Sequence, residues 1–72
     1  MATAINVRLG KRIRELRKAK HWRLIDLAQH CGVKEVHLSH LERGKREVGF
    51  NTLVAIANGL GIKLSDLIRD IE

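Results

Sequence analysis

The sequence predicts an all-α fold, a compact domain of five short helices, and three observations support this prediction. Apolar residues recur at intervals of three and four along most of the chain, which is the period of an amphipathic helix. No proline occurs among the 72 residues, and glycines stand between the apolar runs, where they can end helices. No low-complexity segment or internal repeat interrupts the pattern, so residues 1–72 are expected to form a single domain.

The first half of the chain has the pattern of three helices. Helical spacing predicts them at about residues 6–20, 24–31 and 35–43, and Trp22 is expected to fill the core between the first two. The inward face of the first helix consists of Ile5, Leu9, Ile13 and Leu16. Its opposite face is basic and holds Arg8, Lys11, Arg12, Arg14 and Lys18. A basic outer face favours a polyanionic partner.

The second half predicts two further helices. The fourth is marked by an apolar set, Leu53, Ile56, Ala57 and Leu60. Gly59 and Gly61 are expected to end it, and Ser65 is expected to N-cap a short fifth helix at about residues 65–71, with Asp66 in its first turn. That helix carries an apolar stripe, Leu64, Leu67, Ile68 and Ile71. A helix this short cannot bury such a stripe on both sides, so the four residues predict a two-fold dimer interface.

The segment from Leu27 to Gly44 is the most informative part of the chain. Two short amphipathic helices flank a tight turn at residues 31–33, where Gly32 suits the left-handed backbone that ends a helix. A helix, a turn of about three to four residues and a second helix form the DNA-binding helix-turn-helix pattern. It covers about residues 24–43 here, and its second helix is the one that enters a major groove.

The charge of the chain is unevenly distributed. Residues 1–46 hold 12 Lys/Arg and 4 Asp/Glu, a net charge of +8, whereas residues 47–72 hold 2 and 4, a net charge of −2. The basic half is the half that contains the helix-turn-helix pattern. This coincidence predicts a polyanion-binding surface in the first half and a separate back face in the second.

Composition also limits the other classes of function. A single cysteine excludes an intrachain disulfide, no apolar run approaches the ~20 residues that span a bilayer, and no signal-peptide pattern is present. We therefore expect a cytoplasmic protein with no membrane partner. One Trp, one Phe and no Tyr do not supply the aromatic platform on which single-stranded nucleic acids stack.

Four segments together resemble the Cro-like, phage-repressor helix-turn-helix family of the xenobiotic-response-element type. They are LGKRIRELRKAK at residues 9–20, LAQHCGV at 27–33, LSHLERGKR at 38–46 and LVAIANGLGIKLSDLI at 53–68. The resemblance implies a lambda-repressor-like fold and a bacterial or phage transcription regulator that binds double-stranded operator DNA, usually as a homodimer, with no cofactor. Small members of the family are phage repressors, antitoxin autoregulators and restriction–modification controllers. An antitoxin whose main partner is a toxin protein is the alternative function.

The chain departs from the family at two helix starts. Relatives begin the second helix with Ser or Thr followed by Gln and cap the recognition helix with Ser or Thr, whereas this chain has Arg23-Leu24 and Lys34. The missing Gln braces DNA contacts in relatives, so its absence bears on the contact geometry and not on the fold. A cation at a helix N-terminus is unfavourable on its own, so we expect Arg23 and Lys34 to contact DNA phosphates.

The third helix supplies the candidate base-reading residues. If Leu38 and Leu41 face the core, the outer face carries Glu35, Val36, Ser39, His40 and Arg43. Glu35 could accept a hydrogen bond from a cytosine amino group, His40 could donate one to a guanine, and Val36 could touch a thymine methyl. The alternatives are a solvated acid near the helix N-terminus for Glu35 and partial core burial for Val36.

The resemblance also assigns roles to residues that do not read bases. Arg43, Lys45 and Arg46 follow the recognition helix and would contact phosphates, as their counterparts do in the family. Arg17 and Glu42 match two positions that form a structural ion pair in relatives, and we expect this pair to fix the angle at which the recognition helix docks.

No catalytic or metal site is expected. Four potential zinc ligands, His30, Cys31, His37 and His40, do not follow a recognised ligand pattern, although two of the histidines are one helical turn apart. No nucleophile stands at a suitable spacing from a base, and no glycine-rich loop suits a phosphate. We therefore do not expect an enzyme.

Overall fold

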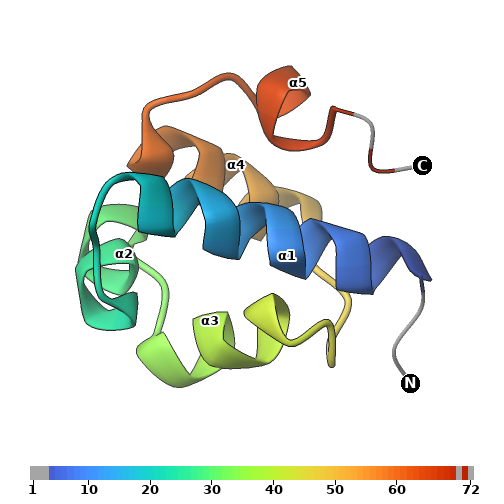
Figure 1. The fold of residues 1–72 in the computed structure, drawn as a ribbon, viewed down its shortest axis with the longest axis horizontal. Helices are drawn as coiled ribbons and strands as arrows, with labels where there is room; N and C mark the ends of the chain where they lie inside the picture. Colours follow the sequence, from blue (N-terminus) through green and yellow to red (C-terminus); the bar gives the residue numbers. More distant parts are fainter. Residues whose placement is uncertain (1–3, 70, 72) are drawn as a thin grey trace.

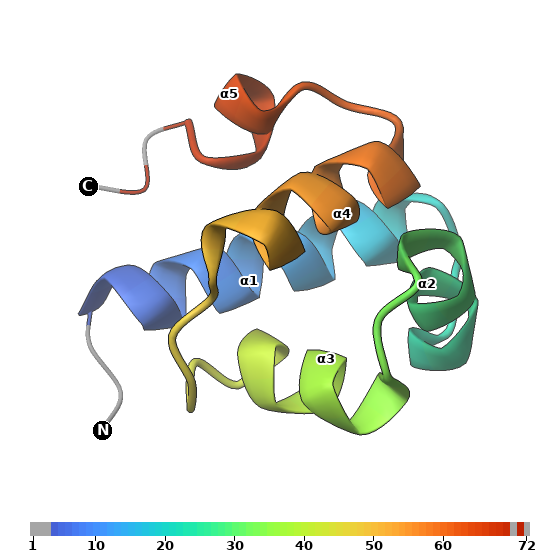
Figure 2. The ribbon, with the colours of Figure 1, turned by 180° about the vertical axis from the view of Figure 1, so that it is seen from behind.

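The computed structural model describes residues 4–69 and 71, and the described part of the chain is entirely helical apart from turns and loops. The five helices are α1 (Ala4–Ala19), α2 (Leu24–Cys31), α3 (Glu35–Glu42), α4 (Phe50–Leu60) and α5 (Leu64–Leu67). The predicted all-α, five-helix fold is therefore confirmed. Helix α3 lies along one side of the molecule and α5 lies on the opposite side, with α1 and α4 between them (Figures 1 and 2).

A single core joins all five helices. Its fully buried large side chains are Ile13, Leu27, Leu38, Leu41, Ile56, Leu60 and Leu67. Each helix contributes at least one of them, since each presents an apolar stripe at intervals of three and four. The packed helix pairs are α1 with α3, α2 with α3, α2 with α4 and α4 with α5. Helix α3 is thereby held on its inner side by both α1 and α2.

The turn between α2 and α3 has the geometry that the sequence predicts. Gly32 adopts a left-handed backbone with φ of 69°, and its N–H donates to the carbonyl of Ala28. The N–H of Val33 donates to the same carbonyl, so the last turn of α2 is closed before the chain enters α3. The chain therefore reverses between the two helices of the helix-turn-helix within a few residues.

Two predicted helix ends are wrong. Gly59 does not end α4, which continues to Leu60 and ends at left-handed Gly61. A Cβ at Gly59 would lie 2.4 Å from the Cys31 sulfur, so this glycine allows α2 and α4 to pack closely. Ser65 is not the N-cap of α5, because Lys63 is. Because α5 begins at Leu64, the side chains of Leu64 and Leu67 pack on the core. The free energy of burying them outweighs a serine cap, which is worth about 1 kcal/mol.

Candidate nucleic-acid interface

The outer face of α3 is available for a partner. Leu38 and Leu41 are buried beneath the helix, whereas Glu35 and Val36 are exposed and Ser39 and His40 are half-buried. Val36 keeps 62% of its surface, which is unusual for a large apolar side chain on an amphipathic helix. Of the two interpretations of Val36 made above, the structure therefore disagrees with partial core burial.

Three exposed cations follow the recognition helix in an ordered turn. Arg43, Lys45 and Arg46 are all exposed. Gly44 stands among them with φ of 70°, and the N–H groups of Gly44 and Lys45 donate to the carbonyls of Leu41 and His40. This arrangement closes the C-terminal end of α3 and fixes the backbone from which the three cations project.

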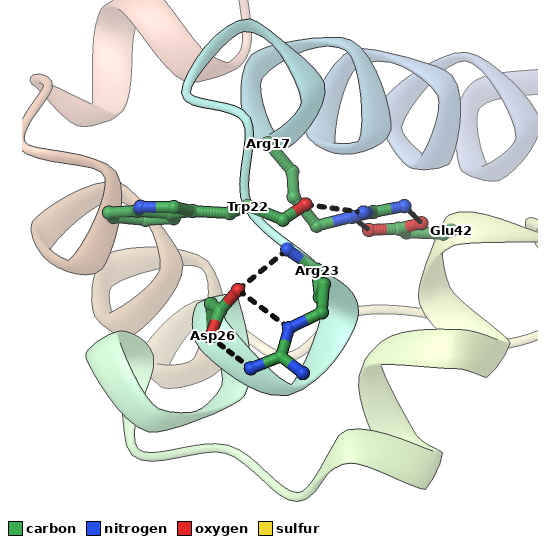
Figure 3. Close-up of polar contacts among 5 residues, drawn as sticks. All are labelled: Arg17, Trp22, Arg23, Asp26 and Glu42. Atoms are coloured by element: carbon green, nitrogen blue, oxygen red, sulfur yellow. Dashed lines mark hydrogen bonds and ion pairs between the residues drawn. The ribbon is translucent and has the colours of Figure 1, made fainter.

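Arg17 and Glu42 fix the position of α3 through a bidentate ion pair (Figure 3). The Arg17 Nε–Glu42 Oε2 distance is 2.7 Å, the second guanidinium–carboxylate distance is 3.0 Å, and the side chains are only 13% and 8% exposed. A further guanidinium N–H donates to the carbonyl of Trp22 at 2.8 Å. The hydrogen bond to Glu42 raises the pKa of Arg17. One side chain thus ties the end of α1 to the turn between α1 and α2 and to the end of α3.

Gly10 is a positioning residue that the sequence analysis missed. It lies in the middle of α1, and a Cβ there would lie 2.3 Å from the carbonyl oxygen of Leu41 and 2.7 Å from that of Glu42. The C-terminal end of α3 can approach α1 this closely only because residue 10 has no side chain. A glycine inside a helical pattern is a signal for such an approach, so the sequence did contain the information.

The start of α2 is capped by a residue that the sequence analysis also overlooked. The Asp26 carboxylate accepts a hydrogen bond from the backbone N–H of Arg23 at 2.8 Å, and the Arg23 guanidinium contacts the same carboxylate at 3.3 Å (Figure 3). These hydrogen bonds lower the pKa of Asp26. An acid three residues after the cap is half of a capping box, so this contact could have been predicted. The Arg23 side chain remains 80% exposed although it pairs with Asp26.

The start of α3 has no such compensation. Lys34 is exposed, has the extended backbone of an N-cap residue (φ −64°, ψ 139°) and makes no side-chain cap. No ion pair within residues 4–69 and 71 includes Lys34, so its charge at the positive end of the recognition helix is not compensated there.

Trp22 is only partly a core residue. One side of it packs on the core, as predicted, but its ring also stacks on the exposed His30, with 4.1 Å between ring centroids and 12° between planes. The Lys20 ammonium lies 5.1 Å from the same ring. The tryptophan is thereby enclosed by its own chain, which leaves it unsuited to stacking on a base.

Two arginines of the basic face of α1 have a structural role that the sequence did not predict. Arg8 donates to the carbonyl of Ile71 at 3.2 Å, and Arg12 donates to the carbonyl of Asp66 at 2.8 Å. Both carbonyls lie in α5 or just after it, on the side of the molecule away from α3 (Figure 1). Part of the basic face of α1 therefore also has a structural role within the chain.

The apolar stripe of the fifth helix is mostly used within the chain. Leu67 is fully buried, Ile71 is 9% exposed, and Leu64 is half-buried against the core. Only Ile68 is clearly exposed, at 43%. The premise that this helix could not bury its stripe in one chain was wrong, because α5 packs on α4 and is bonded to the first half of α1 through Arg8 and Arg12. A dimer interface must therefore include residues from other elements.

No metal or membrane site was found in the described residues. Within residues 4–69 and 71, no three His, Cys, Asp or Glu side chains are grouped to hold a metal ion. Cys31 is buried, which raises the pKa of its thiol to about 11 and disfavours the thiolate that a metal requires. None of the helices in that part of the chain is long and apolar enough to cross a bilayer.

The arrangement of an exposed recognition helix, a glycine turn and a cationic loop can be compared with known proteins. The helix-turn-helix family profile matches residues 13–67. The chain belongs to the helix-turn-helix family. A solved structure, the restriction-modification controller protein C.AhdI from Aeromonas hydrophila, superimposes with a TM-score of 0.87 at 34% identity, over 90% of this chain and 98% of that one.

Curated relatives of the chain include transcription regulators and control proteins. Control protein C.MunI from Mycoplasma sp is 40% identical over 73 residues, which cover 94% of this chain and 93% of that protein. An uncharacterised helix-turn-helix-type transcriptional regulator of Mycobacterium tuberculosis is 45% identical over 53 residues. The match covers 74% of this chain but only 21% of the mycobacterial protein, so the chain spans about a fifth of that relative's length. These relatives and the matching profile assign the chain to the Cro-like helix-turn-helix family.

Proposed function

We propose that this chain binds double-stranded operator DNA as a homodimer and regulates transcription as a restriction–modification controller or a related autoregulator. The observation that carries the proposal is the exposed outer face of α3, held in place by the buried Arg17–Glu42 pair and followed by three exposed cations. A helix so mounted fits the major groove, about 12 Å wide, while the flanking cations meet the phosphates.

Base reading falls to four residues of α3, namely Glu35, Val36, Ser39 and His40. The carboxylate of Glu35 accepts from a cytosine amino group, His40 donates to a guanine, and the exposed Val36 meets a thymine methyl. Phosphate contacts fall to five cations: Lys34 before α3, Arg43, Lys45 and Arg46 after it, and Arg23 at the start of α2. These cations position the protein and add affinity without selecting a sequence.

The extent of the similarity supports the proposed subclass. The likeness to controller proteins runs over nearly the whole of both chains, whereas the likeness to the mycobacterial regulator is confined to a small part of it. No observation favours a toxin protein as the main partner. A regulator of bacterial operators acts where the DNA is, so the proposed location is the cytoplasm. The proposal assigns no catalytic step to the chain.

Selection of binding sites from random duplex DNA, followed by a footprint on the selected site, tests this function. A two-fold dimer should protect two half-sites whose centres are about 34 Å apart, one turn of the double helix. His40→Ala and Val36→Ala should each relax the preference at one position of both half-sites. A selection that enriches no sequence and leaves no footprint would contradict the proposed function.

A further inference from the structure

A cationic hollow of about 390 Å³ opens between α1 and the segment that follows α5. Four cations, one anion and one apolar side chain line it: Arg8, Lys11, Arg12, Arg69, Glu15 and Ile71. Helix α3 contributes nothing to the hollow, and α3 and α5 lie on opposite sides of the molecule (Figures 1 and 2). The cationic hollow is therefore separate from the face proposed to bind DNA.

The positive charge of the cationic hollow is poorly compensated within the chain. In the part of the chain that the structure describes, no ion pair includes Arg8, Lys11 or Arg12. These residues follow one another at intervals of three and four along α1, so their like charges share one face of the helix and repel one another. Glu15 is four residues beyond Lys11, but it is exposed and takes part in none of the printed ion pairs of residues 4–69 and 71. A bound anion would relieve the repulsion.

Two of the arginines are already held in position by the backbone of the neighbouring segment. Arg12 donates to the carbonyl of Asp66 at 2.8 Å, and Arg8 donates to that of Ile71 at 3.2 Å. The Nε–H of Arg12 is buried and has no acceptor among the described residues. Side chains anchored in this way lose little further conformational freedom when a ligand binds, and a guanidinium has five N–H groups to donate. The cationic hollow is therefore preorganised for a ligand that is rich in acceptors.

We propose that the cationic hollow binds a small anion with two or three phosphoryl groups, either a free polyphosphate or the phosphate chain of a nucleotide. Three of its four cations are arginines, whose planar guanidinium groups bind phosphoryl oxygens at two points. Four cations around one compact hollow suit a ligand that concentrates its negative charge. An extended acidic peptide spreads single charges about 7 Å apart on each side and would need a longer surface.

A ligand in the cationic hollow would join α1 to the segment after α5. Its phosphoryl groups would be held by Lys11 on one side and Arg69 on the other, in addition to the two arginine–carbonyl bonds. Because the site exists only in the folded chain, the ligand should raise the melting temperature by about 5 °C at a concentration of about ten times its dissociation constant. The site would thus serve an effector, which goes beyond the proposed function and leaves α3 free for DNA.

Titration calorimetry with inorganic triphosphate, at constant ionic strength, compares the wild type with two double variants. Lys11→Gln/Arg69→Gln removes two cations that line the hollow, whereas Arg14→Gln/Lys18→Gln removes two exposed cations of α1 that do not. Each variant loses one lysine and one arginine, so both lose the same net charge. The first should raise the dissociation constant by about tenfold or more, and the second by less than about twofold. Circular dichroism verifies that both variants fold.

Amide NMR spectra locate the bound triphosphate. Its addition should shift the resonances of residues 8–15 and 69 most. Shifts concentrated at Arg43, Lys45 and Arg46 would place the anion beside the recognition helix and overturn the proposal. Equal losses of affinity in the two double variants would also overturn it, because they would reflect net charge alone, and so would a wild type that binds no triphosphate at about 1 mM.

Two further titrations distinguish the sources of the phosphoryl groups. A nucleoside triphosphate that binds more tightly than inorganic triphosphate would support a nucleotide as the ligand, and one that binds more weakly would support a free polyphosphate. A short polyglutamate peptide that binds more tightly than both would overturn the proposal in favour of an acidic protein segment. None of these titrations contains DNA, so their failure is distinguishable from a failure of the proposed function.

Discussion

At the scale of single residues, the Arg17 guanidinium is the contact on which the recognition surface depends. It is bonded to Glu42 at two points and to the carbonyl of Trp22 at a third, and it is almost removed from solvent. An ion pair with this geometry differs from a surface pair because either partner, left alone, would be a buried charge without compensation.

Glu42→Ala should therefore destabilise the protein strongly. We expect a loss of about 3–5 kcal/mol in the free energy of unfolding, measured by chemical denaturation. Arg69→Ala is the control, because Arg69 pairs with Asp66 at the surface, where the loss should be about 0–1 kcal/mol. Equal losses in the two variants would mean that the Arg17–Glu42 pair is solvated.

The cation at the start of α2 is a second feature at this scale. Asp26 already accepts the backbone N–H of Arg23, so a serine at position 23 would complete a capping box by accepting the N–H of Asp26. We expect Arg23→Ser to raise the melting temperature of the free protein by about 2–5 °C. It should also weaken binding to every duplex alike, because a phosphate contact carries no sequence information.

Lys34→Ser tests the same two effects, on stability and on DNA affinity, at the start of α3. Lys34 has no acid in the place that Asp26 takes at α2, so its replacement should give the same loss of affinity and a similar gain in stability through a new cap. Unchanged affinity in both variants would show that neither cation meets DNA. Weaker binding at only one operator position would make that residue a base reader.

At the scale of the elements, the position of α3 against α1 depends on Gly10. The carbonyl oxygens at the end of α3 lie where a side chain at residue 10 would be. Gly10→Ala should force the two helices apart, at a cost of about 1–3 kcal/mol in the free energy of unfolding, and should lower DNA affinity by tilting α3.

Gly49→Ala is the control for that prediction. Nothing lies within 4 Å of a Cβ at Gly49, and its backbone is extended, so stability should change by only about 0.5 kcal/mol. If Gly10→Ala is tolerated as well as Gly49→Ala, the close approach of α1 and α3 does not set the position of the recognition helix.

The elements also show what could be predicted from the sequence. Local patterns gave the five helices, the glycine turn at Gly32 and the outward face of α3, because apolar period and left-handed glycine are properties of short segments. The errors concern contacts between distant segments. Gly59 was taken as a helix end and not as a contact with Cys31, and the bonds from Arg8 and Arg12 to carbonyls in and after α5 were not predicted. Only the packed structure brings such partners together.

At the scale of the whole molecule, the structure divides its positive charge between two faces. Arg43, Lys45 and Arg46 project from the turn after α3, whereas Arg8 and Arg12 bind carbonyls on the opposite side. The net charge of +6 is therefore spread over both faces, and only a subset of the basic residues is expected to meet DNA. This division has a measurable consequence, because each phosphate contact releases a counterion.

The salt dependence of duplex binding should measure how many of the basic residues contact phosphates. With about six to ten phosphate contacts in a dimer, the logarithm of the binding constant should fall against the logarithm of salt concentration with a slope of about −5 to −9. Lys45→Ala should make the slope less negative by about 2, because the dimer loses one contact in each half-site.

Lys11→Ala is the matched control, since Lys11 is an exposed lysine that lies with Arg8, Arg12 and Arg69 on the α5 side of α1. The slope measured for this variant should equal that of the wild type. If Lys11→Ala reduces the slope as much as Lys45→Ala does, the DNA contacts extend over α1 and the separation of the two faces is wrong.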